Sequence, residues 1–222
     1  MYSAWTNNSG GVTGARVGMA IGADDGSLEH ATRGREVRLA AETGPLGELE
    51  GSHAIVICDV ENLSLSASGL GCTVCYRTLA AKLKAASCRC SLHAFFSCTS
   101  RDRRRILHFL SSGWTPHPQR PETVRTWQGK RSRTNSDNAI LFNAGVLLSG
   151  ITFDTVIIAS GDGDLVSDLA RFVSELQIPR QVFTLSLPGS TSARLNAETN
   201  RLISGNLEVG KDCLRGLAQK HD

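Results

Sequence analysis

The segment Ala54-Ile55-Val56-Ile57-Cys58-Asp59-Val60-Glu61-Asn62 places five apolar residues directly before a group rich in acids and amides. Apolar and polar residues do not alternate in the run from Ala54 to Cys58, so we expect a strand buried on both faces. Such strands occur in parallel sheets that helices cover on both sides. Open sheets of this kind bind ligands at the carboxyl ends of their strands, so the residues after Cys58 are candidates for a functional site.

Short β-branched runs alternate with stretches of helical spacing from residue 53 onward, which predicts an α/β fold with a central, mainly parallel sheet. The expected strands are Ala54 to Cys58, Leu92 to Cys98, Thr123 to Trp127, Thr155 to Ala159 and Gln181 to Leu187. The expected helices are Cys75 to Ala86, Arg101 to Ser111, Ser136 to Leu148, Leu165 to Leu176 and Ala193 to Ile203. Pro116, Pro118 and Pro121 predict a loop.

The first 50 residues contain nine glycines and no sustained apolar period. We therefore expect an N-terminal arm over residues 1–50, partly disordered or forming a small edge element. The folded domain is expected over residues 51–205, and residues 206–222 are expected to be a C-terminal tail.

The composition is that of a soluble globular protein, with 222 residues, 41% apolar residues and a formal net charge of +3. The longest apolar runs fall far short of the roughly 18 residues that a spanning helix needs. Residues 1–26 lack the pattern of a secretory signal, so the expected location is cytoplasmic and no membrane partner is expected. The odd count of seven cysteines favours reduced thiols over paired disulfides.

Acidic residues follow a second predicted strand as well, in Ser160-Gly161-Asp162-Gly163-Asp164. Asp137 adds a third location, because it shares one face of its predicted helix with Leu141, Ala144 and Leu148. Crowding Asp59, Asp137, Asp162 and Asp164 without a counter-charge would be costly, and a divalent cation removes that cost. Oxygen ligands suit Mg²⁺ or Mn²⁺, which one or two carboxylates bind directly while other acids orient waters. Taken singly, each acid could also be a turn or helix-capping residue.

These residues resemble the NYN domain of the PIN-like nuclease superfamily. The resemblance rests on Asp59-x-x-Asn62 after an apolar strand, on Asp137 opening a mid-chain helix, and on Ser160-Gly161-Asp162-x-Asp164, and it runs from about His53 to Ser204. It implies a three-layer α/β/α sandwich and a ribonuclease that uses Mg²⁺ or Mn²⁺. It also implies that Asp59, Asp137, Asp162 and Asp164 surround the metal and that a metal-activated water hydrolyses the RNA phosphodiester bond.

The resemblance further implies roles in substrate binding for two uncharged residues. Asn62 would hold the first loop or a phosphate oxygen, and Ser160 would form a hydrogen bond at the metal or the phosphate. The chain departs from the family pattern at three positions, where Thr134 replaces a frequent Lys, Asn143 replaces a frequent acid, and Thr199-Asn200 stands where Ala-Asp is common.

The charge distribution independently favours RNA as the partner. Residues 101–133 contain nine basic and two acidic residues, a local charge of +7, so the rest of the chain carries −4. Arg125, Lys130, Arg131 and Arg133 precede Asp137 and are expected to bind the phosphate backbone, while Trp114 and Trp127 are available to stack on bases.

Three other interpretations remain open at this point. The chain could be a non-catalytic RNA-binding or scaffold module on the same fold, which Asn143 and Thr134 favour. Asp162-Gly163-Asp164 could belong to a glycosyltransferase, and the cysteine pairs Cys72/Cys75 and Cys88/Cys90 loosely match zinc spacing. A homodimer is also left open.

Overall fold

The computed structural model describes residues 46–99, 102–126, 129–133, 136–150, 152–176, 180–197 and 200–217. Tertiary contacts divide the chain into two units, Met1–Glu42 and Thr43–Asp222, and every described residue belongs to the second. The arm expected over residues 1–50 therefore lies outside the described residues except for its last five. Of those five, Leu49 is fully buried in the domain core.

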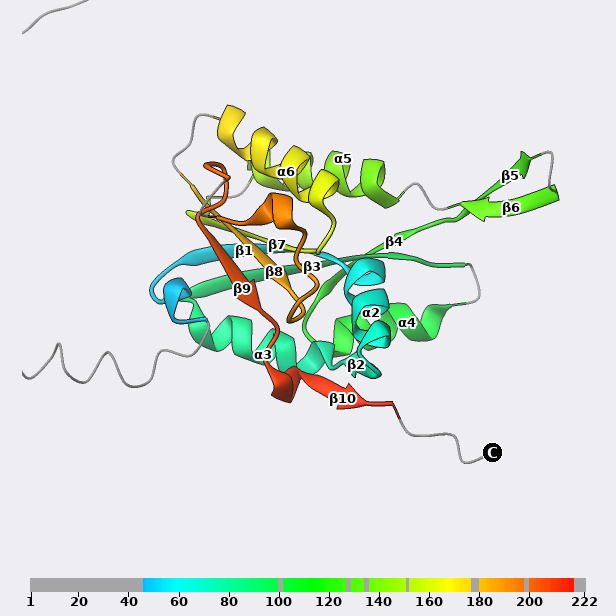
Figure 1. The fold of residues 1–222 in the computed structure, drawn as a ribbon, viewed down its shortest axis with the longest axis horizontal. Coiled ribbons are helices and arrows are strands. Elements are labelled where there is room, and N and C mark those ends of the chain that lie inside the picture. Colours follow the sequence, from blue (N-terminus) through cyan, green and yellow to red (C-terminus); the bar gives the residue numbers. More distant parts are fainter. Residues whose placement is uncertain are drawn as a thin grey trace, which may run out of the picture. The chain divides into compact units, whose positions relative to one another are not determined.

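The described elements alternate between strands and helices (Figure 1). In chain order they are η1 (Gly47–Leu49), β1 (His53–Asp59), α2 (Val60–Gly69), β2 (Cys72–Val74), α3 (Tyr76–Ala86), β3 (Arg89–Ser97), α4 (Arg103–Ser111), β4 (Thr115–Gln119), β5 (Glu122–Thr126), β6 (Gly129–Arg133), α5 (Ser136–Gly150), β7 (Thr155–Ala159), α6 (Gly163–Glu175), β8 (Gln181–Ser186), η2 (Ala193–Leu195), β9 (Gly205–Glu208), η3 (Lys211–Cys213) and β10 (Leu214–Gly216).

A six-stranded parallel sheet in the order β4-β3-β1-β7-β8-β9 forms the centre of the domain. β1 is an inner strand, and its side chains enter two separate cores. Ile55 and Ile57 pack with α5 and α6, whereas Val56 and Cys58 pack with α2 and α3 on the opposite face. The expected three-layer α/β/α sandwich is thus confirmed, and both faces of the sheet are covered (Figure 1).

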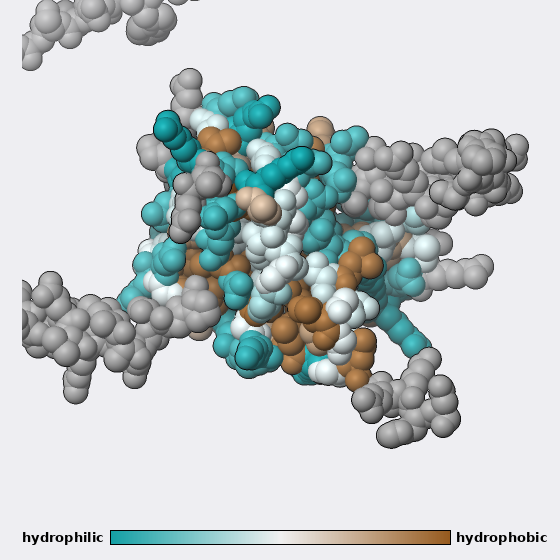
Figure 2. Space-filling model, viewed as in Figure 1, coloured by the Kyte–Doolittle hydropathy of each residue, from teal (hydrophilic) through white to brown (hydrophobic). Residues whose placement is uncertain are grey.

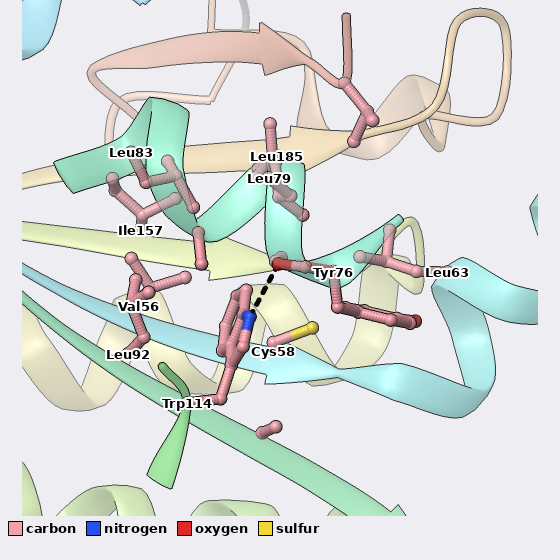
Figure 3. Packing of buried hydrophobic residues seen from close by; sticks show 14 of the residues in the cluster. Val56, Cys58, Leu63, Tyr76, Leu79, Leu83, Leu92, Trp114, Ile157 and Leu185 are labelled. Atoms are coloured by element: carbon pink, nitrogen blue, oxygen red, sulfur yellow. Dashed lines mark hydrogen bonds between the residues drawn. The ribbon is translucent and has the colours of Figure 1, made fainter. Parts of the chain in front are cut away.

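Trp114 belongs to the core on the α3 side of the sheet. Its side chain is 2% exposed, and its indole Nε1–H donates a hydrogen bond to the backbone oxygen of Tyr76 at 2.9 Å (Figure 3). The ring also packs edge-on against the Tyr76 ring. The expectation that Trp114 stacks on RNA bases is therefore wrong; Trp127 lies outside the described residues.

The proline-rich stretch that the sequence predicts as a loop is instead the edge strand β4. In a parallel strand, alternate residues direct their backbone groups to opposite sides, and β4 needs donors only toward β3. Gln119 lies on the β3 side, where its backbone oxygen accepts from Cys98 at 2.8 Å. Pro116 and Pro118, which alternate with it, occupy the outer edge, where a missing N–H costs no ladder bond.

The chain between η2 and β9 also differs from the expectation of a helix over Ala193 to Ile203. Among the described residues of that stretch, 193–197 and 200–203, only Ala193–Leu195 is helical, as a single 3₁₀ turn. The side chain of Asn206 explains this, because it donates to the backbone oxygen of Leu195 at 2.6 Å and accepts from the N–H of Ala197 at 2.9 Å. Those two backbone groups are no longer free to continue a helix.

The segment expected as a C-terminal tail packs against the domain in its described part. β9 pairs with β8 through Glu208, and Val209 and Cys213 are buried. The sheet therefore continues beyond residue 205. The helix α2 was not predicted, because its Ser-rich sequence leaves only Val60, Leu63 and Ala67 as buried contacts. No described helix is long and apolar enough to cross a membrane.

Candidate functional site

The ends of β1 and β7 lie side by side, because these strands pair in parallel with Cys58 opposite Ala159. The next residues along each strand are Asp59 and Ser160. Two of the acidic segments that the sequence singled out therefore start from neighbouring positions at the carboxyl edge of the sheet.

Asp59 is the most deeply buried acid of this edge, with 6% of its surface exposed. Its Oδ1 caps α2 by accepting from the backbone N–H of Asn62 at 3.1 Å. Burial, together with the negative charges of Glu61, Asp137 and Asp162, raises the pKa of Asp59 to about 6 against the opposing effect of the Asn62 hydrogen bond. The carboxylate thus sits in a field that disfavours its own charge.

Asn62 joins the two loops. Its side-chain oxygen accepts a hydrogen bond from the backbone N–H of Gly161 at 2.7 Å, which links the residues after β1 to those after β7. A side chain at Gly161 would not fit, since a Cβ there would lie 2.6 Å from the backbone oxygen of Ser190. The close approach of the Ser190 backbone therefore requires glycine at this position.

Ser160 and Asp162 organise the second loop internally. The buried Ser160 hydroxyl oxygen accepts from the N–H of Asp162 at 3.2 Å. Asp162 is the N-cap of α6, where its Oδ1 accepts from the N–H groups of Asp164 at 2.9 Å and Leu165 at 3.3 Å. Its charge also acts on Asp59. Asp162 can therefore cap α6 and add its negative charge to the acidic edge at the same time.

The other two predicted acids are exposed. Asp137 lies in the first turn of α5, ahead of the buried Ile140, Ala144 and Leu148, and its charge acts on Asp59. The side chain of Asp164 is 86% exposed and forms an ion pair with Arg194 at 2.9 Å. A role for Asp164 as a direct metal ligand would require it to leave that pair.

Glu61 is a further acid of this edge, and the sequence motifs gave it no role. Its Oε1 accepts from the backbone N–H of Ser97 at 2.8 Å and pairs with Arg105 at 3.2 Å, while Arg105 also donates to the Ser97 oxygen at 2.8 Å. These contacts tie α2 to the end of β3 and to α4. Arg105 is consequently half-buried.

The acids of this edge can be compared with the ligands that the predicted Mg²⁺ or Mn²⁺ would need. Among the described residues, no three His, Cys, Asp or Glu side chains converge closely enough to hold a metal ion between them. This rules out a ready cage of protein ligands, including the zinc site considered for the cysteines. Mg²⁺ usually keeps several waters and takes one or two carboxylates directly, so the buried Asp59 in the field of Asp137 and Asp162 fits an ion of that kind.

The basic residues predicted to bind RNA lie on a separate two-stranded hairpin. In its backbone register Arg125 is opposite Lys130, and Glu122 is opposite Arg133. Arg131 lies between these two pairs, opposite Val124. The hairpin leads directly into α5, so Arg133 is four residues from Asp137.

Residues 53–208 match the NYN domain family. The chain belongs to the NYN domain family. This family is one of PIN-like nucleases, whose members are generally nucleases and typically use divalent metals. The NYN match includes Asp59, Asn62, Asp137 and the Ser160 loop, and it extends through β9.

A solved structure has the same fold as this NYN domain. It is a protein of unknown function from Vibrio parahaemolyticus, which is 18% identical, has a TM-score of 0.59, and aligns over 74% of this chain and 97% of its own. This similarity concerns the fold alone. No curated protein matches the chain.

A cavity of about 280 Å³ in the NYN domain lies between α2, β2 and α4. Val60, Tyr76 and Phe109 form apolar parts of its wall, Arg105 supplies a cation, and no carboxylate lines it. Apolar surface gathers over α2, β2 and β10 in this region (Figure 2). The cavity is therefore unsuited to binding a cation, in contrast to the acidic edge of the sheet.

A pair of histidines, the buried His93 and the half-buried His117, connects β3 to β4. His93 Nδ1 lies 3.0 Å from His117 Nε2, and His93 Nε2 lies 2.9 Å from the Ser91 hydroxyl. Burial, followed by the charge of His117, lowers the pKa of His93 to about 4, and burial also lowers the pKa of His117. Both rings are therefore neutral in the folded protein at pH 7.

This pair predicts a loss of stability in mild acid. A neutral buried His contributes stability that is complete above the unfolded pKa of about 6.5 and is lost as the pH falls toward the folded pKa of about 4. Between pH 7 and pH 5 the loss from His93 is about 2 kcal/mol. Urea unfolding of the wild type and of His93→Gln measures it, and the wild type should lose that much relative to the variant. An unchanged difference between the two would contradict the prediction.

Proposed function

We propose that this NYN domain is a divalent-metal-dependent ribonuclease whose site lies at the carboxyl ends of β1 and β7. The observation that carries the proposal is Asp59, a buried carboxylate at that edge whose burial and acidic neighbours raise its pKa to about 6. A bound cation would stabilise an acid in such surroundings as a carboxylate. Asp59, Asp137 and Asp162 would hold Mg²⁺ or Mn²⁺, directly or through waters, with Asp164 at the exposed rim.

The chain's own residues would supply the geometry of the reaction. Asn62 holds the two loops together through the Gly161 N–H, so it acts on the loop more directly than on a phosphate oxygen. Ser160 fixes the backbone at Asp162, and the α6 cap keeps the Asp162 carboxylate in place. When bound, the cation would lower the pKa of a water and offset charge that develops on the phosphoryl oxygens. No side-chain nucleophile is required.

RNA is the proposed substrate because the family is nuclease-related and because the chain concentrates its basic residues before Asp137. Arg125, Lys130, Arg131 and Arg133 would follow the phosphate backbone toward the acids. Such contacts neutralise phosphates, so RNA binding should weaken as the salt concentration rises.

Cleavage of a labelled single-stranded RNA with Mg²⁺ or Mn²⁺ tests the proposal. We expect activity in the wild type that EDTA removes, a loss in Asp162→Asn, and wild-type activity in Asp168→Asn, which alters an exposed acid on the same helix. Asn retains the capping oxygen of Asp162, so this loss would report the charge and not the helix cap. RNA that is bound by the folded wild type but not cleaved with either metal would overturn the proposal in favour of a non-catalytic RNA-binding module.

Metal binding should also stabilise the protein directly. A ligand that binds only the folded state at 100 times its dissociation constant adds about 2.7 kcal/mol. We expect Mn²⁺ to raise the Tm at pH 8, and to raise it much less at pH 5, where Asp59 is mostly protonated. Differential scanning calorimetry with and without EDTA measures both shifts. A shift of equal size at the two pH values would place the metal elsewhere.

A further inference from the structure

The backbones of Cys75 and Cys213 pair where the C-terminal strand joins the domain. β10 pairs with β2 in an antiparallel register that sets Leu214 opposite Val74, and the next step of that register sets Cys213 opposite Cys75. The backbone N–H of Cys75 donates to the oxygen of Cys213 at 2.7 Å, which extends the pairing to these residues. Opposite residues in such a ladder have Cα atoms about 4.5–5.5 Å apart, within the roughly 4.4–6.8 Å that a disulfide spans.

Cys75 has the surroundings of a reactive thiol. It is partly exposed at the start of α3, and the Thr78 hydroxyl donates a hydrogen bond to its sulfur at 3.1 Å. That bond and a backbone bond from Thr78 lower the pKa of Cys75, and the charge of Arg215 acts in the same direction. These interactions favour the thiolate, which is the nucleophilic form, more than in an ordinary cysteine.

Cys213 has the surroundings of a resolving thiol. It is fully buried, and burial together with the charges of Asp212 and Cys75 raises the pKa of Cys213, which keeps it protonated. Cys72, the other cysteine of this ribbon, alternates to the opposite face of β2, and its thiol donates to the backbone oxygen of Ala67 at 3.3 Å. Within the β2–β10 pairing, Cys213 is therefore the cysteine that can form a disulfide with Cys75.

We propose that Cys75 and Cys213 are an oxidation site at which a hydroperoxide forms an intrachain disulfide. The Cys75 thiolate attacks one peroxide oxygen, the O–O bond breaks, and Cys75 becomes a sulfenic acid while hydroxide, or an alkoxide from an organic peroxide, leaves. The Cys213 thiol then attacks the Cys75 sulfur, forms the S–S bond, and releases the sulfenic oxygen as water. Two thiols are oxidised and one peroxide is reduced, so atoms and electrons balance.

The disulfide would fix the C-terminal segment to the domain. In the reduced protein η3 is joined to α3 by the ion pair between Lys82 and Asp212, which is open to solvent, and by the short β2–β10 ribbon. A covalent link between residues 75 and 213 would close a loop of more than one hundred residues. Long closed loops constrain the unfolded chain most, so oxidation should raise the denaturation midpoint. This inference does not depend on nuclease activity.

Thiol counting on the full-length protein tests the proposal. Reduced protein is treated with equimolar hydrogen peroxide, quenched with catalase, denatured and alkylated with N-ethylmaleimide. The untreated chain should take seven labels and the oxidised chain five, with peptide mapping joining Cys75 to Cys213. Cys75→Ser should abolish the loss of two labels, whereas Cys88→Ser, which removes an exposed thiol elsewhere, should retain it.

A second variant tests the order of the steps. In Cys213→Ala the sulfenic acid on Cys75 has no resolving thiol, so dimedone should label Cys75 there and not in the wild type. Seven labels after oxidation, or a disulfide that maps to other cysteines, would overturn the proposal. If Cys213→Ala does not fold, the Cys75→Ser and Cys88→Ser comparison decides the question alone.

Discussion

Replacing Asp59 by Asn is expected to abolish metal-dependent RNA cleavage while making the folded protein more stable at neutral pH. The variant loses the central carboxylate of the proposed site, so we expect the cleavage rate to fall at least about 100-fold. The same change removes a buried charge that its neighbours Glu61, Asp137 and Asp162 oppose. Asn caps helices about as well as Asp, so the hydrogen bond from Asn62 is retained.

The pH dependence of this stabilisation follows from the direction of the pKa shift. Asp59 has its pKa raised from 3.8 to about 6, so the stability that its protonated form contributes is complete below pH 3.8 and is lost as the pH rises through 6. The amide side chain of the Asp59→Asn variant does not titrate. The variant should therefore match the wild type near pH 4 and exceed it by about 3 kcal/mol at pH 8.

Denaturant unfolding of both proteins at pH 4 and pH 8, in EDTA, measures the difference. Asp168→Asn is the matched control, because it removes an exposed carboxylate from α6 and should change stability little at either pH. An Asp59→Asn protein that is less stable than the wild type at pH 8 would show that the buried carboxylate is already compensated. The case for a cation at this edge would then lose its physical basis.

Replacing Gly161 by Ala is expected to impair folding and cleavage together. The added Cβ would lie 2.6 Å from the backbone oxygen of Ser190 and 3.4 Å from Oδ1 of Asn62. Backbone atoms cannot move aside easily, so we expect a loss of about 1–3 kcal/mol. The bond from Gly161 to Asn62 sets the loop of Asp59 against the loop of Asp162, and a displacement of about 1 Å there would reduce cleavage about 100-fold.

Gly145→Ala is the control for this substitution. Gly145 lies inside α5, where a Cβ would make an ordinary contact of 3.6 Å with Phe172, so Ala should stabilise the protein by about 0.5–1 kcal/mol. Thermal unfolding and cleavage rates are measured on all three proteins. A Gly161→Ala protein that cleaves RNA at the wild-type rate would contradict the role given to the Asn62 bond.

The layer architecture and the position of the acids follow from local sequence. An unalternating run such as Ala54 to Cys58 has to be buried on both faces, which requires a parallel sheet between helices, and the residues after it must then lie at the carboxyl edge. The same local reasoning placed the loop from Ser160 to Asp164 at that edge. These two predictions succeeded because burial period and chain direction are local properties of the sequence. Asp137 was expected on the apolar face of its helix and is instead exposed.

The pairing of polar groups, in contrast, is visible only in the folded chain. Composition does not show that Arg105 forms an ion pair with Glu61 or that Arg194 forms one with Asp164. It also does not show that Asn206 ends the η2 turn. In each case the partner comes from another element of the fold. The proline-rich β4 was missed for the same reason: its prolines are tolerated because only β3 flanks it. Partner choice depends on long-range packing, and a single sequence read locally does not contain it.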